Sequence, residues 1–187
     1  LDGPYPGGNL TSDGGLVTNV DTGEAFCAIQ TAIDDADTLD GHTIIASAGD
    51  YTETVVIDKA IALRGEDAAT TIIDGTGIAG APLINIPSMT GDVTLTGLTI
   101  QNAQPYGGYS QRVCIAANGG AAGTQLTITD TVLLGGFIND LSERDFGLIM
   151  QSTETDLVFT HNTVRDFWWE GILLERFLGQ SEIAWND

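Results

Sequence analysis

Two series of short apolar segments recur along the chain, and their shared spacing is the feature that most limits its fold. The first series begins at Ile61, Val93, Leu126, Leu157 and Ser181, with spacings of 32, 33, 31 and 24 residues. The second begins at Pro82, Val113, Gly147 and Gly171, with spacings of 31, 34 and 24 residues. A β-sandwich gives no reason for two interleaved series with one period, whereas stacked coils do. The spacing therefore predicts an all-β solenoid of some five coils.

The segments themselves read as strands. Each is a short run of apolar and β-branched residues that is followed by Gly, Asn or Asp. Thr, Val and Ile favour strands, and Gly, Asn and Asp favour the corners between them.

One segment ahead of the repeats has a helical pattern instead. Its apolar residues recur at helical spacing at Phe26, Ile29 and Ile33. Asp21 is placed as an N-cap, with Glu24 three residues later as a capping box, and Gly41 lies beyond the end. We expect one amphipathic cap helix at about residues 24–39, whose apolar face covers the open end of the first coil.

Residues 27–75 resemble the N-terminal signature of right-handed parallel β-helix proteins of the pectin-lyase-like superfamily. The resemblance rests on an "IQ-x-AID-x-A" string in the cap helix, a "G-x-Y-x-E" turn and an "L-x-G" strand. The turn holds Gly49, Tyr51 and Glu53, and the strand holds Leu63 and Gly65. The resemblance implies the fold more than an activity, because that superfamily includes lyases, hydrolases, esterases, adhesins and surface proteins.

Together the period and the resemblance predict a right-handed parallel β-helix with an N-terminal cap helix. Residues 1–20 are expected to form an extended arm, and residues 21–187 the β-helix domain. The positions expected to face the interior are Ile44, Val56, Ile72, Ile84, Leu95, Ile100, Ile115, Ile128, Phe159 and Ile172.

The charge balance excludes several partners. Six Lys and Arg residues stand against 26 Asp and Glu, which gives a formal net charge of −20. Nucleic-acid binding needs basic side chains to contact phosphates, and an anionic membrane surface repels such a chain. The sequence has no apolar run of 18 residues for membrane insertion. The acidic, Thr-rich and Gly-rich character fits an extracellular or cell-surface protein.

The best catalytic candidate is the window from His161 to Glu170. It brings Arg165, Asp166 and Glu170 close to the indoles of Trp168 and Trp169. Such a mixture suits stacking on a sugar ring while a carboxylate acts on it. The alternative is a turn between strands, with Asn162 in an asparagine ladder and the indoles filling space. We favour this alternative.

Other candidate sites are weaker. His42 and His161 have no partner at zinc-ligand spacing, so no metal residue is assigned. No cofactor is expected, although calcium stays open because it needs only carboxylates and carbonyls. Cys27 and Cys114 lie about two coils apart, roughly 10 Å, so two separate buried thiols are favoured over a disulfide. Asn9 stands in an N-x-[ST] sequon and is a candidate glycosylation site.

Three functions remain open at this point. The favoured one is a noncatalytic extracellular or cell-surface module with a structural, adhesive or fibre-forming role. The alternatives are a polysaccharide-active enzyme, either a lyase or a glycoside hydrolase, and a carbohydrate-binding module that uses Trp168 and Trp169. Two alternatives are open for the ends of the chain. Either it is a fragment of a longer β-helix, or copies associate head to tail, with the segment from Leu16 to Thr18 adding as a strand to a neighbouring chain. Glycans are the other possible partner.

Overall fold

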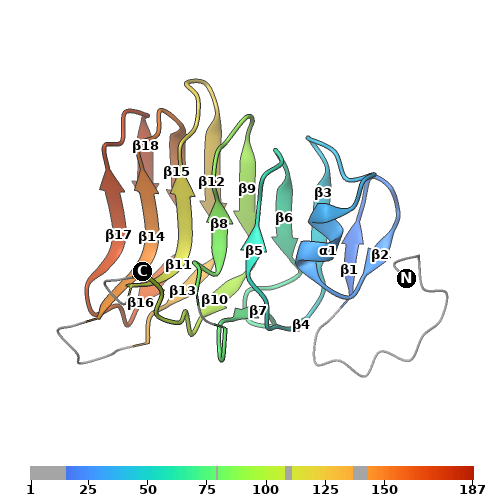
Figure 1. Ribbon diagram of the computed structural model, residues 1–187, viewed down its shortest axis with the longest axis horizontal. Helices are drawn as coiled ribbons and strands as arrows, with labels where there is room; N and C mark the ends of the chain where they lie inside the picture. Colours follow the sequence, from blue (N-terminus) through green and yellow to red (C-terminus); the bar gives the residue numbers. More distant parts are fainter. Residues whose placement is uncertain (1–15, 79, 108–110, 137–142) are drawn as a thin grey trace.

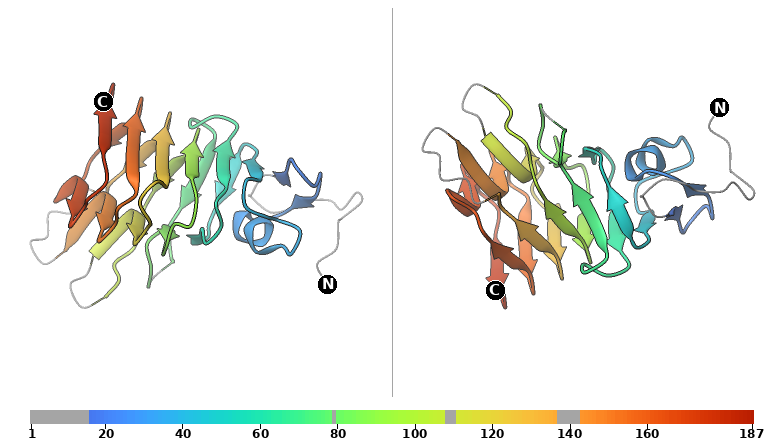
Figure 2. Two further views of the ribbon diagram at one scale, coloured as in Figure 1. Left: turned by 90° about the horizontal axis from the view of Figure 1, so that it is seen from above. Right: turned by 90° about the horizontal axis from the view of Figure 1, so that it is seen from below.

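The computed structural model describes residues 16–78, 80–107, 111–136 and 143–187. Within these residues the strands form three sheets that run along one common axis (Figures 1 and 2). Sheet A contains β3 (Thr43–Ala46), β6 (Ala62–Gly65), β9 (Val93–Thr96), β12 (Gln125–Thr129), β15 (Asp156–Thr160) and β18 (Ser181–Ala184), extended by two N-terminal strands. Sheet B contains β4 (Gly49–Tyr51), β7 (Thr71–Asp74), β10 (Thr99–Gln101), β13 (Val132–Leu134) and β16 (Thr163–Arg165). Sheet C contains β5 (Val55–Val56), β8 (Ile84–Ile86), β11 (Gln111–Asn118), β14 (Arg144–Gln151) and β17 (Glu170–Glu175).

From β3 onward the chain visits sheets A, B and C in turn, so neighbours within a sheet lie three strands apart in the sequence. The pairs formed in this way are parallel, as in β12 with β15 and β11 with β14. The chain is therefore all-β with parallel sheets, as the repeat spacing predicted. This arrangement fits a parallel β-helix.

The core is a stack of equivalent side chains, one from each successive strand of a sheet. In sheet A, Ile44, Leu63, Leu95, Ile128 and Phe159 are in register, and each is fully buried. The next position in this column, Ile183, is 46% exposed because β18 has a strand neighbour on one side only among the described residues. Stacking therefore buries each side chain between the equivalent side chains of the coils on either side.

Most of the predicted interior positions are buried, but the predictions for Val56 and Ile72 are wrong. Val56 is 37% exposed while its neighbour Val55 is fully buried, and Ile72 is half-buried while Ile73 is fully buried. Both errors are shifts of one residue, which exchange the two faces of a strand. Ile172 is only partly buried, because β17 is the last strand of sheet C among the described residues.

The corner between sheets A and B repeats one backbone conformation. Gly97, Asp130, His161 and Trp185 all have positive φ, between 51° and 69°. Asn162 follows this corner, and its amide accepts a hydrogen bond from the Thr131 N–H at 3.0 Å and donates one to the Ile128 carbonyl at 2.9 Å. In the next coil Asn186 accepts a hydrogen bond from the Asn162 N–H at 2.8 Å. Asn162 and Asn186 thus occupy equivalent positions in successive coils, and each side chain bonds to the backbone of the coil before it; no hydrogen bond between asparagine side chains is found among the described residues.

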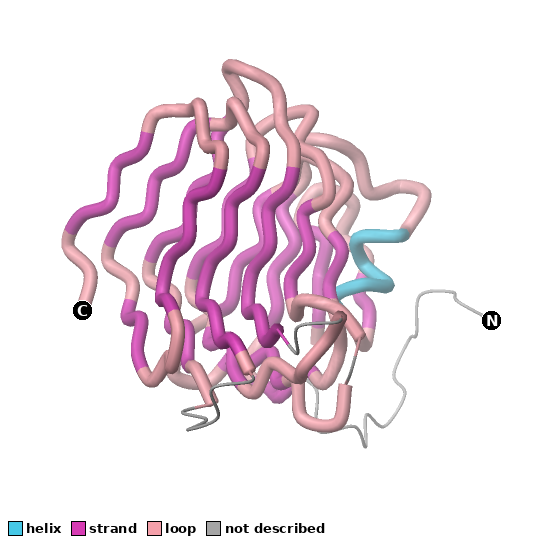
Figure 3. The backbone as a smooth tube through the Cα atoms, turned by 60° about the vertical axis from the view of Figure 1, so that its left-hand side comes forward, coloured by secondary structure: helices cyan, strands magenta, loops and turns pink. Residues whose placement is uncertain are grey.

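The N-terminal cap differs from the expected long helix. The helix α1 covers only Ile29–Asp34 and is preceded by the antiparallel strands β1 (Val17–Asn19) and β2 (Ala25–Phe26) (Figures 1 and 3). The predicted capping box is wrong, because Ala28 is the N-cap and Asp21 instead accepts a hydrogen bond from the Thr43 N–H at 2.7 Å. The segment expected to pair with a neighbouring chain contains β1, which pairs with β3 of its own chain.

Side chains of the cap and the first coil fasten the two together. The carboxylate of Glu53 accepts hydrogen bonds from the Ile29 and Gln30 N–H groups, both at 2.8 Å. The Gln30 side-chain amide accepts from the Val56 N–H at 2.6 Å and donates to the Val56 carbonyl at 3.3 Å. Lys59 donates to the Ile33 carbonyl at 2.6 Å, at the other end of the helix. The Gln30 side chain thus pairs with the backbone N–H and carbonyl of Val56 at the edge of sheet C, as a neighbouring strand would.

Candidate functional site

A hollow lies on the outer face of sheet C, over strands β11, β14 and β17, which stand side by side in Figure 1. Its volume is about 200 Å³. We call it the sheet C hollow, and the side chains that line it come from these strands and the corners beside them. They are Tyr106, Gln111, Ala116, Asn118, Arg144, Phe146, Ile149, Gln151, Trp169, Glu170, Leu173 and Glu175.

The floor of the hollow is a second apolar cluster, separate from the interior. Val113, Ala116, Phe146 and Ile149 are buried in it, and Tyr106 and Leu173 pack against it. In β11 both Cys114 and Ile115, which lie between Val113 and Ala116, belong to the interior core. This local break in alternation places two apolar residues of one strand on the outside.

Polar side chains form rows beside the floor. Asn118, Gln151 and Glu175 occupy one register row across the three strands. The Gln151 amide donates a hydrogen bond to the Glu175 carboxylate at 2.5 Å. On the other side of the floor, Gln111 pairs in register with Arg144, and Phe146 with Glu170.

Trp169 lies at the rim of the hollow and is 47% exposed. The Arg144 guanidinium carbon lies 5.0 Å from the centroid of its ring. A cation over an aromatic face is stabilising and orders both side chains. The Tyr106 hydroxyl, like an ordinary tyrosine, is protonated and able to donate at neutral pH, and burial raises its pKa further.

The corner between sheets B and C holds a buried carboxylate. Asp145 is 2% exposed and accepts a hydrogen bond from the Gly136 N–H at 2.9 Å. Burial raises the pKa of Asp145, and the hydrogen bond and the charge of Arg112 partly oppose this change. Arg112 forms an ion pair with Glu143 at 2.8 Å and donates to the Ala103 carbonyl. These contacts fasten the beginnings of β11 and β14.

Of the three predicted catalytic residues, only Glu170 lines the sheet C hollow. Arg165 and Asp166 are both exposed, and the Arg165 Nε lies 3.8 Å from the Asp166 Oδ2. Neither residue lines the sheet C hollow. Glu170 and Trp169 do line it, together with Arg144.

The remaining candidates lie elsewhere. Trp168 is half-buried and is not part of the lining. Asn9 lies outside the described residues. Cys27 and Cys114 are separate thiols, as expected, but Cys27 is exposed and only Cys114 is buried.

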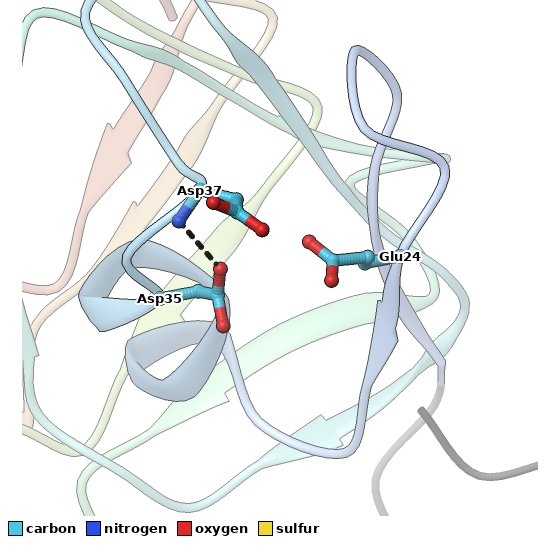
Figure 4. Close-up of side chains that lie close together, drawn as sticks. All are labelled: Glu24, Asp35 and Asp37. Carbon is cyan, nitrogen blue, oxygen red and sulfur yellow. Dashed lines mark hydrogen bonds between the residues drawn. The ribbon is translucent and has the colours of Figure 1, made fainter. Parts of the chain in front are cut away.

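Three carboxylates of the cap also lie close together. Oxygen atoms of Glu24, Asp35 and Asp37 come within 4.8 Å of one another (Figure 4). Asp37 donates its N–H to the Asp35 carboxylate at 2.8 Å, which orders this part of the group. Carboxylate oxygens are ligands that Ca²⁺ prefers, but such clusters also occur on acidic surfaces without a metal. From the sequence no cofactor is expected and calcium is left open, and this group of carboxylates does not decide between the two.

Most of the residues that line the hollow were not singled out in the sequence. The second repeat series contains only part of the signal: aligning its members at Val113, Gly147 and Gly171 places Gln151 and Glu175 in one row but puts Asn118 one residue out of register with Gln151, because Val113 pairs with Phe146. The spacing also does not tell which residues of each strand point outward. In β11 the alternation breaks, because Cys114 and Ile115 both belong to the interior core.

Comparison with known proteins identifies a relative of part of this chain. The chain is 36% identical over 115 residues to a protein named "Cell surface glycoprotein" from Methanothermus fervidus. The match covers 49% of this chain and 19% of that protein, so the chain corresponds to about a fifth of the relative's length. No family model and no solved structure matches the chain. Among the described residues, no helix has the length and apolar character required to cross a membrane.

Proposed function

We propose that the chain is a noncatalytic module of a cell-surface or extracellular protein. The observation that carries this proposal is the 36% identity to a protein named "Cell surface glycoprotein". The net charge of −20 supports it, because a shell of carboxylates keeps an exposed protein hydrated and soluble. Arg165 and Asp166 do not line the hollow that Glu170 lines, which gives less support to a polysaccharide-cleaving role.

The proposed module is a rod built as a right-handed parallel β-helix of the pectin-lyase-like kind. Parallel strands joined by crossovers are right-handed in about 98% of cases, which supports this hand. Rows of side chains spaced at about 4.8 Å along such a rod display a regular surface. An adhesive or fibre-forming role would use this surface.

Self-association of copies is part of the proposal. The last described coil exposes Leu178, Ile183 and Trp185, and β16, β17 and β18 each have one strand neighbour within the described residues. In the chain as given, these strand edges and apolar side chains are available to another copy, whereas in a longer chain a following coil would cover them. The test is sedimentation of the purified chain against Ile183→Lys, which should reduce association; a monomeric wild-type chain would rule out this part.

The experiment that tests the surface location is proteolysis of intact cells that produce the native protein. An epitope in the chain should be lost when protease is added outside the cells, while a cytoplasmic marker should remain. Protection of the epitope until the cells are lysed would overturn the proposal. A parallel assay for new reducing ends or unsaturated products on acidic and neutral glycans should give no turnover, and turnover abolished by Glu170→Gln would establish the enzymatic alternative.

A further inference from the structure

A buried polar network joins the N-terminal cap to the first coil. Its centre is Asn19 in β1, which is fully buried. The Asn19 Oδ1 accepts hydrogen bonds from the Asp21 and Thr22 N–H groups at 3.0 and 3.3 Å, which fixes the orientation of the amide. The Nδ2 group therefore points the other way and lies 2.8 Å from the Thr38 Oγ1 and 3.2 Å from the His42 Nδ1. Each of its two hydrogens has one acceptor.

These contacts decide which nitrogen of the His42 ring carries the proton. The Leu39 N–H also donates to the His42 Nδ1, at 3.3 Å. Because two donors face Nδ1, this nitrogen is an acceptor and the neutral ring carries its proton on Nε2. A positively charged ring carries a hydrogen on both nitrogens, and turning the ring over places a C–H group against the same donors. No orientation of the charged ring therefore keeps both hydrogen bonds.

The network connects three elements at the N-terminal end of the coils (Figure 1). β1 contributes Asn19, and β3 begins directly after His42. Thr38 lies after α1, and its hydroxyl donates to the Ala32 carbonyl of the helix at 2.7 Å. Because β1, α1 and β3 meet at this network, its loss weakens the pairing of β1 with β3 and the attachment of α1 to the first coil.

The charged groups around the His42 ring are mostly acidic. The Asp21 carboxylate accepts a hydrogen bond from the N–H of Thr43, the residue that follows His42. The amine of Lys59 is held by carbonyls of the cap, which limits its effect on the ring. The charged residues on the elements packed around the ring are Asp21, Glu24, Asp34, Asp35, Asp37, Asp40, Asp58, Lys59 and Arg64. Their excess negative charge attracts a proton to the ring, whereas the two hydrogen bonds to Nδ1 resist it.

We propose that His42 is a pH-dependent fastening of the N-terminal cap, which holds while the ring is neutral and is released when the ring takes up a proton. Histidine is the side chain whose charge changes between about pH 5 and pH 8. In the opened cap Nδ1 is free to bind a proton, so opening takes up a proton and becomes more favourable as the pH falls. Opening exposes the edge of β3 that pairs with β1. This device goes beyond the surface location proposed above and does not depend on it.

The test measures amide hydrogen exchange of the full chain by mass spectrometry at about pH 7.5 and about pH 5.5. In the variant His42→Asn a neutral acceptor oxygen replaces Nδ1 and cannot gain a charge. His161→Asn is the matched control, because His161 is the second of the two histidines and is exposed, and Asn tolerates its φ of 58°. Comparing the chains at the same pH removes the intrinsic pH dependence of exchange.

We expect the wild type and His42→Asn to exchange the amides of β1 and α1 at rates within about threefold of one another at the higher pH. At the lower pH the wild type should exchange them about tenfold faster than His42→Asn, as expected for the loss of two hydrogen bonds. The amides of β12 and β15 should differ little, and His161→Asn should behave as the wild type does. The proposal is overturned if the ratio is the same at both pH values, or if exchange becomes faster in every sheet.

Nitrogen NMR of the two imidazole rings gives a second test on the wild-type chain, which does not require a variant to fold. At neutral pH the His42 ring should carry its proton on Nε2, and its protonation should shift the signals of the Leu39 N–H and the Asn19 side-chain amide. A proton on Nδ1 at neutral pH would contradict the proposal, as would titration of the ring that leaves these two signals unchanged.

Discussion

The contact between Glu53 and the start of α1 gives the sharpest prediction for stability. One carboxylate accepts hydrogen bonds from two N–H groups, Ile29 and Gln30, both at 2.8 Å. Hydrogen bonds to a charged group each contribute about 1.5–3 kcal/mol, and the cost of burying the charge offsets part of this gain. We therefore expect Glu53→Ala to lower the free energy of unfolding by about 2–3 kcal/mol, measured by urea denaturation.

The variant Glu53→Gln is the matched control, because it keeps one acceptor oxygen and the size of the side chain. We expect it to lose about half as much stability as Glu53→Ala. A loss below about 0.5 kcal/mol in Glu53→Ala would refute the reasoning, because it would show that these two hydrogen bonds do not hold the cap on the first coil.

The pH dependence tests the charge of Glu53 separately. Burial raises the pKa of Glu53 above its ordinary value, although the two hydrogen bonds oppose this change. A carboxyl group with a higher pKa in the folded state binds more protons there than in the unfolded state, so its contribution falls as the pH rises. The stability of the wild type relative to Glu53→Gln should therefore decrease between about pH 4 and pH 7. An increase over this range would contradict the assigned direction of the pKa.

Three further predictions concern the core, the corner and the thiols. Phe159→Ala should cost about 3–5 kcal/mol in urea denaturation, whereas Ile183→Ala should cost less than about 1.5 kcal/mol because Ile183 is 46% exposed; equal losses would show that the end of the stack is covered. Asn162→Ala should cost about 2–3 kcal/mol, because it leaves an N–H and a carbonyl of the preceding coil unpaired, and a near-neutral effect in the same assay would show that water replaces the amide. Cys27 should react with a thiol reagent in the native protein and Cys114 only after unfolding, because Cys114 is buried and burial raises the pKa of its thiol; reaction of both in the native state would be the contrary result.

The repeat spacing predicted the sheets well because it depends on the length of chain needed to pass through all three. It did not fix which side chains point inward. In the run Val55–Ile57 every residue is apolar, so alternation does not distinguish the buried Val55 from the exposed Val56. The same is true of Ile72 and Ile73. Only the register with the neighbouring coil settles the phase of such a strand.

The cap was mispredicted for a different reason. Asp21 and Glu24 have the spacing of a capping box, but the N–H groups at the start of α1 are satisfied by Glu53, a residue 24 positions after Ile29. Local patterns do not contain a contact of this range. The "IQ" string that carried the family resemblance does have a local meaning in the structure, since the Gln30 amide occupies the edge of β5.

The one irregularity in the period helps to explain the hollow. The last spacing in both repeat series is 24 residues instead of 31 to 34. The connection from β16 to β17 contains only residues 166–169, whereas the connection from β13 to β14 contains residues 135–143. A corner this short has no room to project away from the sheets, so Trp169 comes to lie directly before β17 and at the rim of the outer face of sheet C. The shortened repeat, visible in the sequence as a change of spacing, thus places an aromatic side chain beside the apolar cluster under the sheet C hollow.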